Sequence, residues 1–168
     1  FPGAGSTPLK ATLTGAAGGE IVEVTPGQTD GGGRYSVQSG DTRKFWKVTA
    51  GPDGGFEVTF EQPTAAFGFF GIDIGDFGGK LSIELRRDGR VIETLPVGNA
   101  VAEGDNSIDG SVLFFGFTSA SDQELFTSVR FLSTAGDQDD VFAFDNFTIG
   151  ELKREQPVPE PGSLALVA

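Results

Sequence analysis

Hydrophobic and polar residues alternate along most of this chain, a pattern typical of half-buried β-strands. The clearest case is residues 56–63 (FEVTFEQP), where three apolar side chains alternate with Glu57, Thr59 and Glu61. Such a strand has one face on a core and the other in water. Residues 65–74 (AAFGFFGIDI) are instead apolar on both faces, which predicts a central strand that is buried on both sides.

The remaining pattern consists of short strands and tight turns, with no segment that predicts a helix. Residues 80–95 predict a hairpin that turns at Asp88-Gly89. Further strands are predicted at residues 9–14, 20–25, 34–39, 43–49, 111–119, 125–132 and 141–150, with 15–19 as the turn between the first two and with 34–39 paired to 43–49. Roughly ten short strands predict an all-β fold, an antiparallel β-sandwich of jelly-roll type, with a barrel as the alternative. The two Phe-Phe pairs, at 69–70 and 114–115, are expected in central strands.

The last predicted strand changes its apolar face partway along. Phe142 and Phe144 have one parity, whereas Phe147 and Ile149 have the other. This predicts a β-bulge near Asp145, or a strand buried on both sides. In either case the Asp145 carboxylate is expected to be partly buried and to need a partner.

Composition narrows the classes of function. The 168 residues carry a net charge of −12, which repels the phosphate backbone, so we expect no nucleic acid partner. The chain has no Cys and no His, which excludes thiol catalysis, a Ser-His-Asp triad and histidine-bound zinc. Glu57 and Glu61 share a strand face but lie roughly 13 Å apart, too far for a pair of glycosidase carboxylates. A cross-strand pair that involves Glu84 stays open as an alternative, but charged residues on a solvated strand face explain these glutamates. We therefore predict that the protein is not an enzyme.

The pattern divides the chain into three parts. Residues 1–8 are expected to form an extended arm, 9–150 the β-sandwich domain, and 151–168 a linker that leaves it. The last part has Pro at 157, 159 and 161, and proline cannot donate to a β-ladder.

The final eleven residues, VPEPGSLALVA, resemble the start of the PEP-CTERM sorting signal of Gram-negative bacteria. The matching motif is Val158, Pro159, Glu160, Pro161 and Gly162. A spanning helix of about 20 apolar residues and a basic cluster would complete that signal, and neither is present here. The resemblance implies recognition by an exosortase, export across the inner membrane, and an extracellular or cell-surface location.

The domain is also similar to one that recurs in such exported proteins, through AFGFFGIDIGDFGGKLSIEL, GSVLFFGF, FTSVRF and DVFAFDNFTIG. The resemblance implies a β-rich structural protein of the surface or extracellular matrix, such as a biofilm. We expect such a protein to self-associate, with the alternating residues near the N-terminus donated as a strand to a neighbouring copy, so that a filament forms. The alternative is a glycan-binding jelly-roll module that contacts the exopolysaccharide of the matrix.

Two kinds of binding site are candidates. Calcium takes six to eight oxygen ligands, and Asp73, Asp76, Asp140 and Asp145, with neighbours at 137 and 139, are candidates for a structural Ca²⁺ site. The alternative without a metal is that these carboxylates accept hydrogen bonds from the backbone or face water. No cofactor is otherwise required. For a glycan, Trp46 and Tyr35 are the candidate stacking residues, with packing of Trp46 at a sheet edge as the alternative explanation for this residue.

Overall fold

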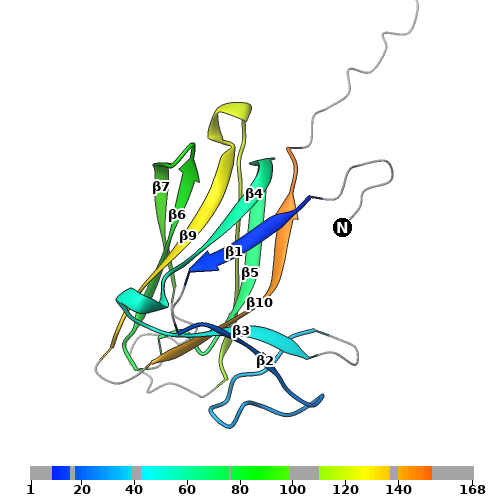
Figure 1. Ribbon diagram of the computed structural model, residues 1–168, viewed down its shortest axis with the longest axis vertical. Coiled ribbons are helices and arrows are strands. Elements are labelled where there is room, and N and C mark those ends of the chain that lie inside the picture. Colours follow the sequence, from blue (N-terminus) through cyan, green and yellow to red (C-terminus); the bar gives the residue numbers. More distant parts are fainter. Residues whose placement is uncertain are drawn as a thin grey trace, which may run out of the picture.

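Two antiparallel five-stranded sheets pack face to face in the computed structural model, which describes residues 9–15, 18–38, 43–75, 77–98, 110–136 and 140–152 (Figure 1). The first sheet has the order β1 (Ala11–Gly15), β4 (Phe56–Thr64), β9 (Phe126–Thr134), β6 (Lys80–Arg87) and β7 (Arg90–Val97). The second has the order β2 (Glu20–Glu23), β3 (Lys44–Thr49), β10 (Val141–Gly150), β5 (Ala66–Ile72) and β8 (Val112–Thr118). The predicted antiparallel β-sandwich is confirmed.

The connections between strands differ in length, and the longest joins β2 to β3 through residues 24–43. Two single-turn 3₁₀ helices, η1 (Pro52–Gly54) and η2 (Asp122–Glu124), precede β4 and β9. No helix in the described ranges is long and apolar enough to cross a membrane. The predicted arm at 1–8 and the linker from residue 153 onward lie outside the described residues.

Phenylalanine fills the core between the two sheets. The rings of Phe56 and Phe131, on neighbouring strands β4 and β9, stack with centroids 4.2 Å apart. Phe144 of the opposite sheet meets Phe56 and Phe131 edge-on, at centroid distances of 5.1 and 5.3 Å. Offset and edge-to-face contacts of this kind are favoured between aromatic rings. Alternation at 56–60 is confirmed, since Phe56, Val58 and Phe60 are all buried.

A second apolar cluster lies on the outer face of the second sheet. We call residues 24–38 the covering segment. Part of this segment lies over three residues that are buried there, Phe45, Ile72 and Ala143. The covering segment adds Val24, Tyr35 and Val37 to this cluster. The sandwich therefore has a third layer over one part of one sheet.

The predicted bulge in β10 is confirmed. The pairing of β10 with β5 shifts between Asp145 and Thr148, and Asn146 has a positive φ of 49°. The extra residue returns Phe147 and Ile149 to the inner face, where both pack against the core. The turn at Asp88-Gly89 is also confirmed, with positive φ at both residues, as a type I′ hairpin requires.

Three details of the predicted pairing are wrong. Residues 34–38 form no strand, because their alternating side chains pack on the outer cluster and their polar groups bond to Asp145. The strands β1 and β2 do not form a hairpin, because β1 pairs with β4 in one sheet and β2 with β3 in the other. Of the two Phe-Phe pairs, Phe69-Phe70 lies in the interior strand β5, but Phe114-Phe115 lies in β8 at a sheet edge.

Candidate functional site

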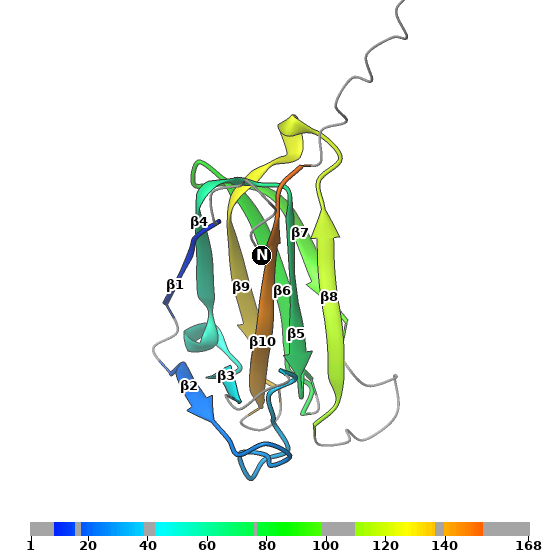
Figure 2. The same cartoon turned by 90° about the vertical axis from the view of Figure 1, so that its right-hand side faces the viewer.

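Beyond the covering segment, where β10, β5 and β8 run side by side, no described residue covers the outer face of the second sheet (Figure 2). A shallow depression of about 380 Å³ lies on this part of the sheet. Its lining includes the residues that we call the Phe114 platform: Gly68, Phe114, Gly116, Thr118, Thr148 and Gly150. Three of the six are glycines, so the sheet backbone forms much of the floor.

Phe114 is the exposed aromatic side chain of this surface. It is 60% exposed, although Leu113, Phe115 and Phe117 on the same strand point into the sandwich. Its ring rests on Gly68 and Gly116, which are directly paired across β5 and β8. A Cβ atom at Gly68 would lie 2.8 Å from the ring Cζ, and one at Gly116 would lie 3.0 Å from Cε1. Only glycine at both positions leaves space for this ring position.

Phe70 supports the ring from the side. Its centroid is 5.1 Å from that of Phe114, and the two rings are tilted by 58°. Thr148 and Thr118 are exposed at the same surface and offer hydroxyl groups. No charged side chain is among the described residues that line this depression. The surface thus combines an exposed ring, bare backbone and neutral hydrogen-bonding groups.

Tyr35 and Trp46 do not reach the Phe114 platform. Tyr35 packs on the outer cluster and lines a separate cavity of about 360 Å³ with Ser36 and Arg43. Trp46 packs against the main core, with its ring edge-on to Phe56 at 6.2 Å. It lines another cavity, of about 430 Å³, whose lining also includes Lys44. The structure therefore separates the two predicted stacking residues from each other.

The candidate calcium ligands are also apart. Asp145 is buried and accepts hydrogen bonds from Ser36 Oγ and Val37 N at Oδ2, both at 2.8 Å, and from Gln38 Nε2 at Oδ1, at 3.0 Å. Asp73 is buried, with a φ of 63°, and accepts hydrogen bonds from Arg34 Nη1 and Gly110 N. Asp140 is buried and accepts one from Gly79 N at 3.0 Å.

These contacts fit the predicted need of Asp145 for a partner, and they are made with protein donors. Within the described ranges, no three acidic residues come together in a group that could hold a metal ion. Asp76 and the acidic residues at 137 and 139 lie outside those ranges. A calcium site stays a prediction, which a higher melting temperature in millimolar calcium than in EDTA would support.

Asp30 is a buried carboxylate that the sequence analysis missed. Arg34 Nε donates to its Oδ2 at 2.9 Å, and Gly32 N donates to its Oδ1 at 3.0 Å. Burial raises the pKa of the Asp30 carboxyl, but the hydrogen bonds and the positive charge of Arg34 outweigh burial and hold the pKa below its ordinary value. Because Arg34 also pairs with Asp73 at 3.2 Å, it ties the covering segment to the end of β5.

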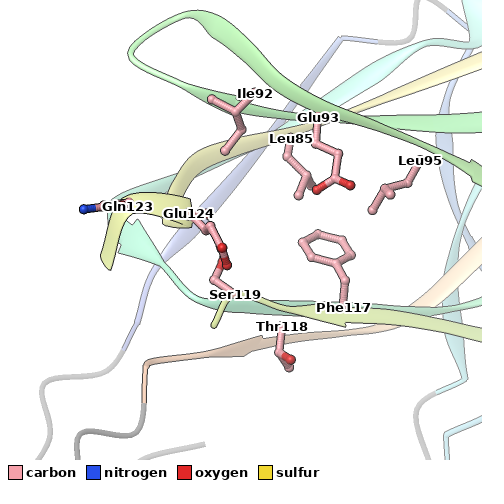
Figure 3. A pocket seen from close by; sticks show the side chains of 9 residues that line it. All are labelled: Leu85, Ile92, Glu93, Leu95, Phe117, Thr118, Ser119, Gln123 and Glu124. Carbon is pink, nitrogen blue, oxygen red and sulfur yellow. Dashed lines mark hydrogen bonds between the residues drawn. The ribbon is translucent and has the colours of Figure 1, made fainter. Parts of the chain in front are cut away.

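A mixed cavity of about 450 Å³ opens between β7 and the end of β8 (Figure 3). Phe117 and Leu95 face each other across it, and the carboxylate of Glu93 points in between Leu85 and Leu95. Glu93 has the inward parity of β7, since it pairs with the buried Leu85. An inward charge on an edge strand discourages pairing with another chain, and that explains Glu93 without a ligand.

The candidate carboxylates on the first sheet belong to a charged outer face. Glu57 and Glu84 each pair with Arg130, on either side of it, and Arg86 lies 3.7 Å from Glu57. Alternating charges of opposite sign on a solvated strand face support each other. The arrangement accounts for these glutamates without catalysis.

No protein-family model and no curated protein matches the chain. Among solved structures, the chain is similar to the enzymatically active domain of tailspike protein 4 of bacteriophage CBA120, at 10% identity and a TM-score of 0.42, over 84% of this chain and 19% of that chain. The structure of TmCBM61 with β-1,4-galactotriose gives 13% identity and a TM-score of 0.49, over 84% and 88%. The family 11 carbohydrate-binding module of Clostridium thermocellum, with a mixed-linked tetrasaccharide, gives 10% and 0.39, over 89% and 93%.

Similarity at this level carries no argument about a site. The chain spans about a fifth of the length of the tailspike domain that it matches, since the match covers 19% of it.

Proposed function

We propose that this protein is a carbohydrate-binding module that holds a neutral polysaccharide on the Phe114 platform. The observation that carries the proposal is the ring of Phe114, 60% exposed and resting on the paired glycines Gly68 and Gly116. A large exposed apolar group is costly in water and marks a binding surface when it lies in a depression. One face of a pyranose ring carries mainly C–H groups, and these pack well on an aromatic ring.

The remaining groups of the site favour a sugar over other flat ligands. The Thr118 hydroxyl, near the ring, can both donate and accept, as sugar hydroxyls require, whereas the Thr148 hydroxyl donates to Asn146 O at 3.2 Å and offers its oxygen as an acceptor. The net charge of −12 disfavours the binding of acidic polysaccharides, and also of nucleic acids because their phosphate backbone is negative. Neutral polymers meet no such repulsion.

Export fits this function. The sorting motif predicted at Val158–Gly162 lies outside the described residues, and it would place the module among extracellular polysaccharides. A filament built by donated N-terminal strands gains no support, since β1 and β2 already pair within their own chain. The binding proposal needs no catalytic residue.

The test is a comparison of Phe114→Ala with Phe114→Trp on a panel of neutral polysaccharides, by affinity electrophoresis and calorimetry. Stacking of a nucleic acid base on an aromatic ring contributes about 1–3 kcal/mol, and a similar contribution from a pyranose face would make Phe114→Ala weaken binding by about five- to 150-fold, whereas Phe114→Trp should retain it. Val112→Ala is the matched control, because Val112 is an exposed residue of the same face of β8 outside the depression. Equal binding by Phe114→Ala and the wild type would refute the proposal.

A further inference from the structure

Strand β8 has one free side. It pairs with β5 along its whole length, from Val112 opposite Ile72 to Thr118 opposite Ala66, and no described residue pairs with its other side (Figure 2). A free side presents unpaired N–H and C=O groups, which form a template for pairing with another chain. Strand β8 is therefore a candidate interface.

The other three edge strands carry features that prevent such pairing, and β8 carries none. Strand β2 is four residues long with Glu at both ends, and β1 is five residues long. Strand β7 has the inward-facing Glu93, a proline at 96 and an irregular register with β6. Strand β8 reads VLFFGFT, with no charge and no proline, and its register with β5 is unbroken.

Hydrogen bonds that flank β8 show which groups face the free side. Asp73 N donates to Ser111 O at 2.8 Å, and Ser119 N donates to Ala65 O at 2.6 Å. In an antiparallel ladder the residues alternate between those bonded to the neighbour and those turned away. The N–H and C=O groups of Val112, Phe114, Gly116 and Thr118 therefore point to the free side.

We propose that β8 pairs antiparallel with β8 of a second copy, about a two-fold axis that passes Phe115. This register sets Phe114 opposite Gly116 and Val112 opposite Thr118, each twice by symmetry. All four outward residues are then paired. The bulky ring faces a glycine, and no two like charges meet because β8 has none.

Such a dimer joins the two second sheets into one continuous sheet. It leaves the outer face open, so the two Phe114 platforms would lie next to each other on one surface. The pairing does not depend on glycan binding. The copies repel each other through their net charge of −12, and we expect the dimer to tighten when salt screens that charge.

Cysteine cross-linking tests the register, since the chain has no cysteine of its own. Val112→Cys and Thr118→Cys, mixed under mild oxidation, should give a disulfide between unlike chains, because paired Cα atoms lie about 5.5 Å apart. Val112→Cys alone should not form one, because the two copies of residue 112 would be roughly 20 Å apart. Equal cross-linking of like and unlike chains, or none in either, would overturn the proposed register.

Sedimentation equilibrium of the unmodified chain tests the dimer itself. We expect the apparent mass to approach that of a dimer as protein concentration and salt increase. Val112→Pro removes an outward N–H, at a strand start where proline is tolerated, and should shift the chain to monomer. Val112→Lys is a second variant in case the proline disturbs folding, and Val91→Lys, on exposed Val91 of edge strand β7, is its matched control.

The variants at Val112 and Val91 change no residue of the Phe114 platform. A chain that stays monomeric at millimolar concentration in high salt, or a dimer that both Val112 variants leave unchanged, would refute the pairing. If the Val112→Pro monomer still binds polysaccharide, the dimer is not needed for the proposed function. The test of the dimer and the test of polysaccharide binding are then independent of each other.

Discussion

Single buried carboxylates hold the covering segment on the second sheet. Asp145 accepts hydrogen bonds from Ser36, Val37 and Gln38, and also from Asn146 N at 2.7 Å. Two donors thus approach each of its oxygen atoms. If Asn replaces Asp145, one carboxylate oxygen becomes an NH₂ group. This NH₂ group would face two of the donors and could not accept their hydrogen bonds.

We therefore expect Asp145→Asn to lower the free energy of unfolding by about 2–4 kcal/mol, because buried donors lose their acceptor. Ser36→Ala, which removes one donor, should cost about 1 kcal/mol. Urea denaturation measures both, and hydrogen exchange at residues 36–38 should accelerate in Asp145→Asn. A loss of less than about 0.5 kcal/mol for Asp145→Asn would show that these bonds do not stabilise the fold.

Asp30 gives the stability a defined dependence on pH. Its pKa is held below the ordinary value of 3.8 in the folded chain, so the ionised form stabilises the fold above that value. The contribution is lost as the pH falls through the lower, folded-state pKa. We expect Asp30→Asn to cost about 1–3 kcal/mol at pH 7 and progressively less as the pH falls below about 4.

Urea denaturation of the wild type and Asp30→Asn between pH 7 and pH 3 measures that difference. Glu61→Gln is the control, because Glu61 is exposed and its nearest cation, Lys10 Nζ, is 3.8 Å away. A gap between the wild type and Asp30→Asn that stays constant down to pH 3 would contradict the assignment.

At the scale of elements, the bulge in β10 aligns the strand with the core. Asn146 takes a φ of 49°, a region open to Asn and Gly and closed to β-branched residues. We expect Asn146→Gly to change the free energy of unfolding by less than about 0.5 kcal/mol and Asn146→Val to lower it by about 1–2 kcal/mol. Thermal denaturation compares the two, and equal stability of both variants would mean that the bulge moves without cost.

The paired glycines of β5 and β8 show how one element can shape another's surface. Gly68 and Gly116 contribute no side chain, and that absence lets Phe114 lie on the sheet. The signal was in the sequence, because Phe114 has the opposite parity to Leu113, Phe115 and Phe117. That parity marks an outward ring only once β8 is known to lie at an edge, with no described residue over its outer face.

For the whole molecule, the chain end carries the prediction of export. We expect replacement of Pro159, Glu160 and Pro161 by Ala in the natural precursor to stop the mature protein from reaching the surface or the medium. Immunoblots of cell and medium fractions measure this, with Ala replacements of Pro26, Pro52 and Pro63 inside residues 9–150 as the control. Normal secretion of the tail variant would show that this motif does not act as a sorting signal.

The sequence by itself determined where most strands lie and which of their faces is buried. Alternation with a period of two records burial directly, so Phe56, Val58 and Phe60 could be assigned to the core. The change of parity between Phe144 and Phe147 likewise revealed the bulge and the burial of Asp145. These are local properties, because each depends on the direction of side chains along one strand.

Only the tertiary structure decided which strands are neighbours and what covers each face. Residues 34–38 alternate like a strand, yet they lie across a sheet face and bond to Asp145, more than a hundred residues away. The edge position of β8 and the pairing of Gly68 with Gly116 are equally non-local. Ladder partners are chosen by the packing of the whole sandwich, and alternation in one strand carries no information about the strand beside it.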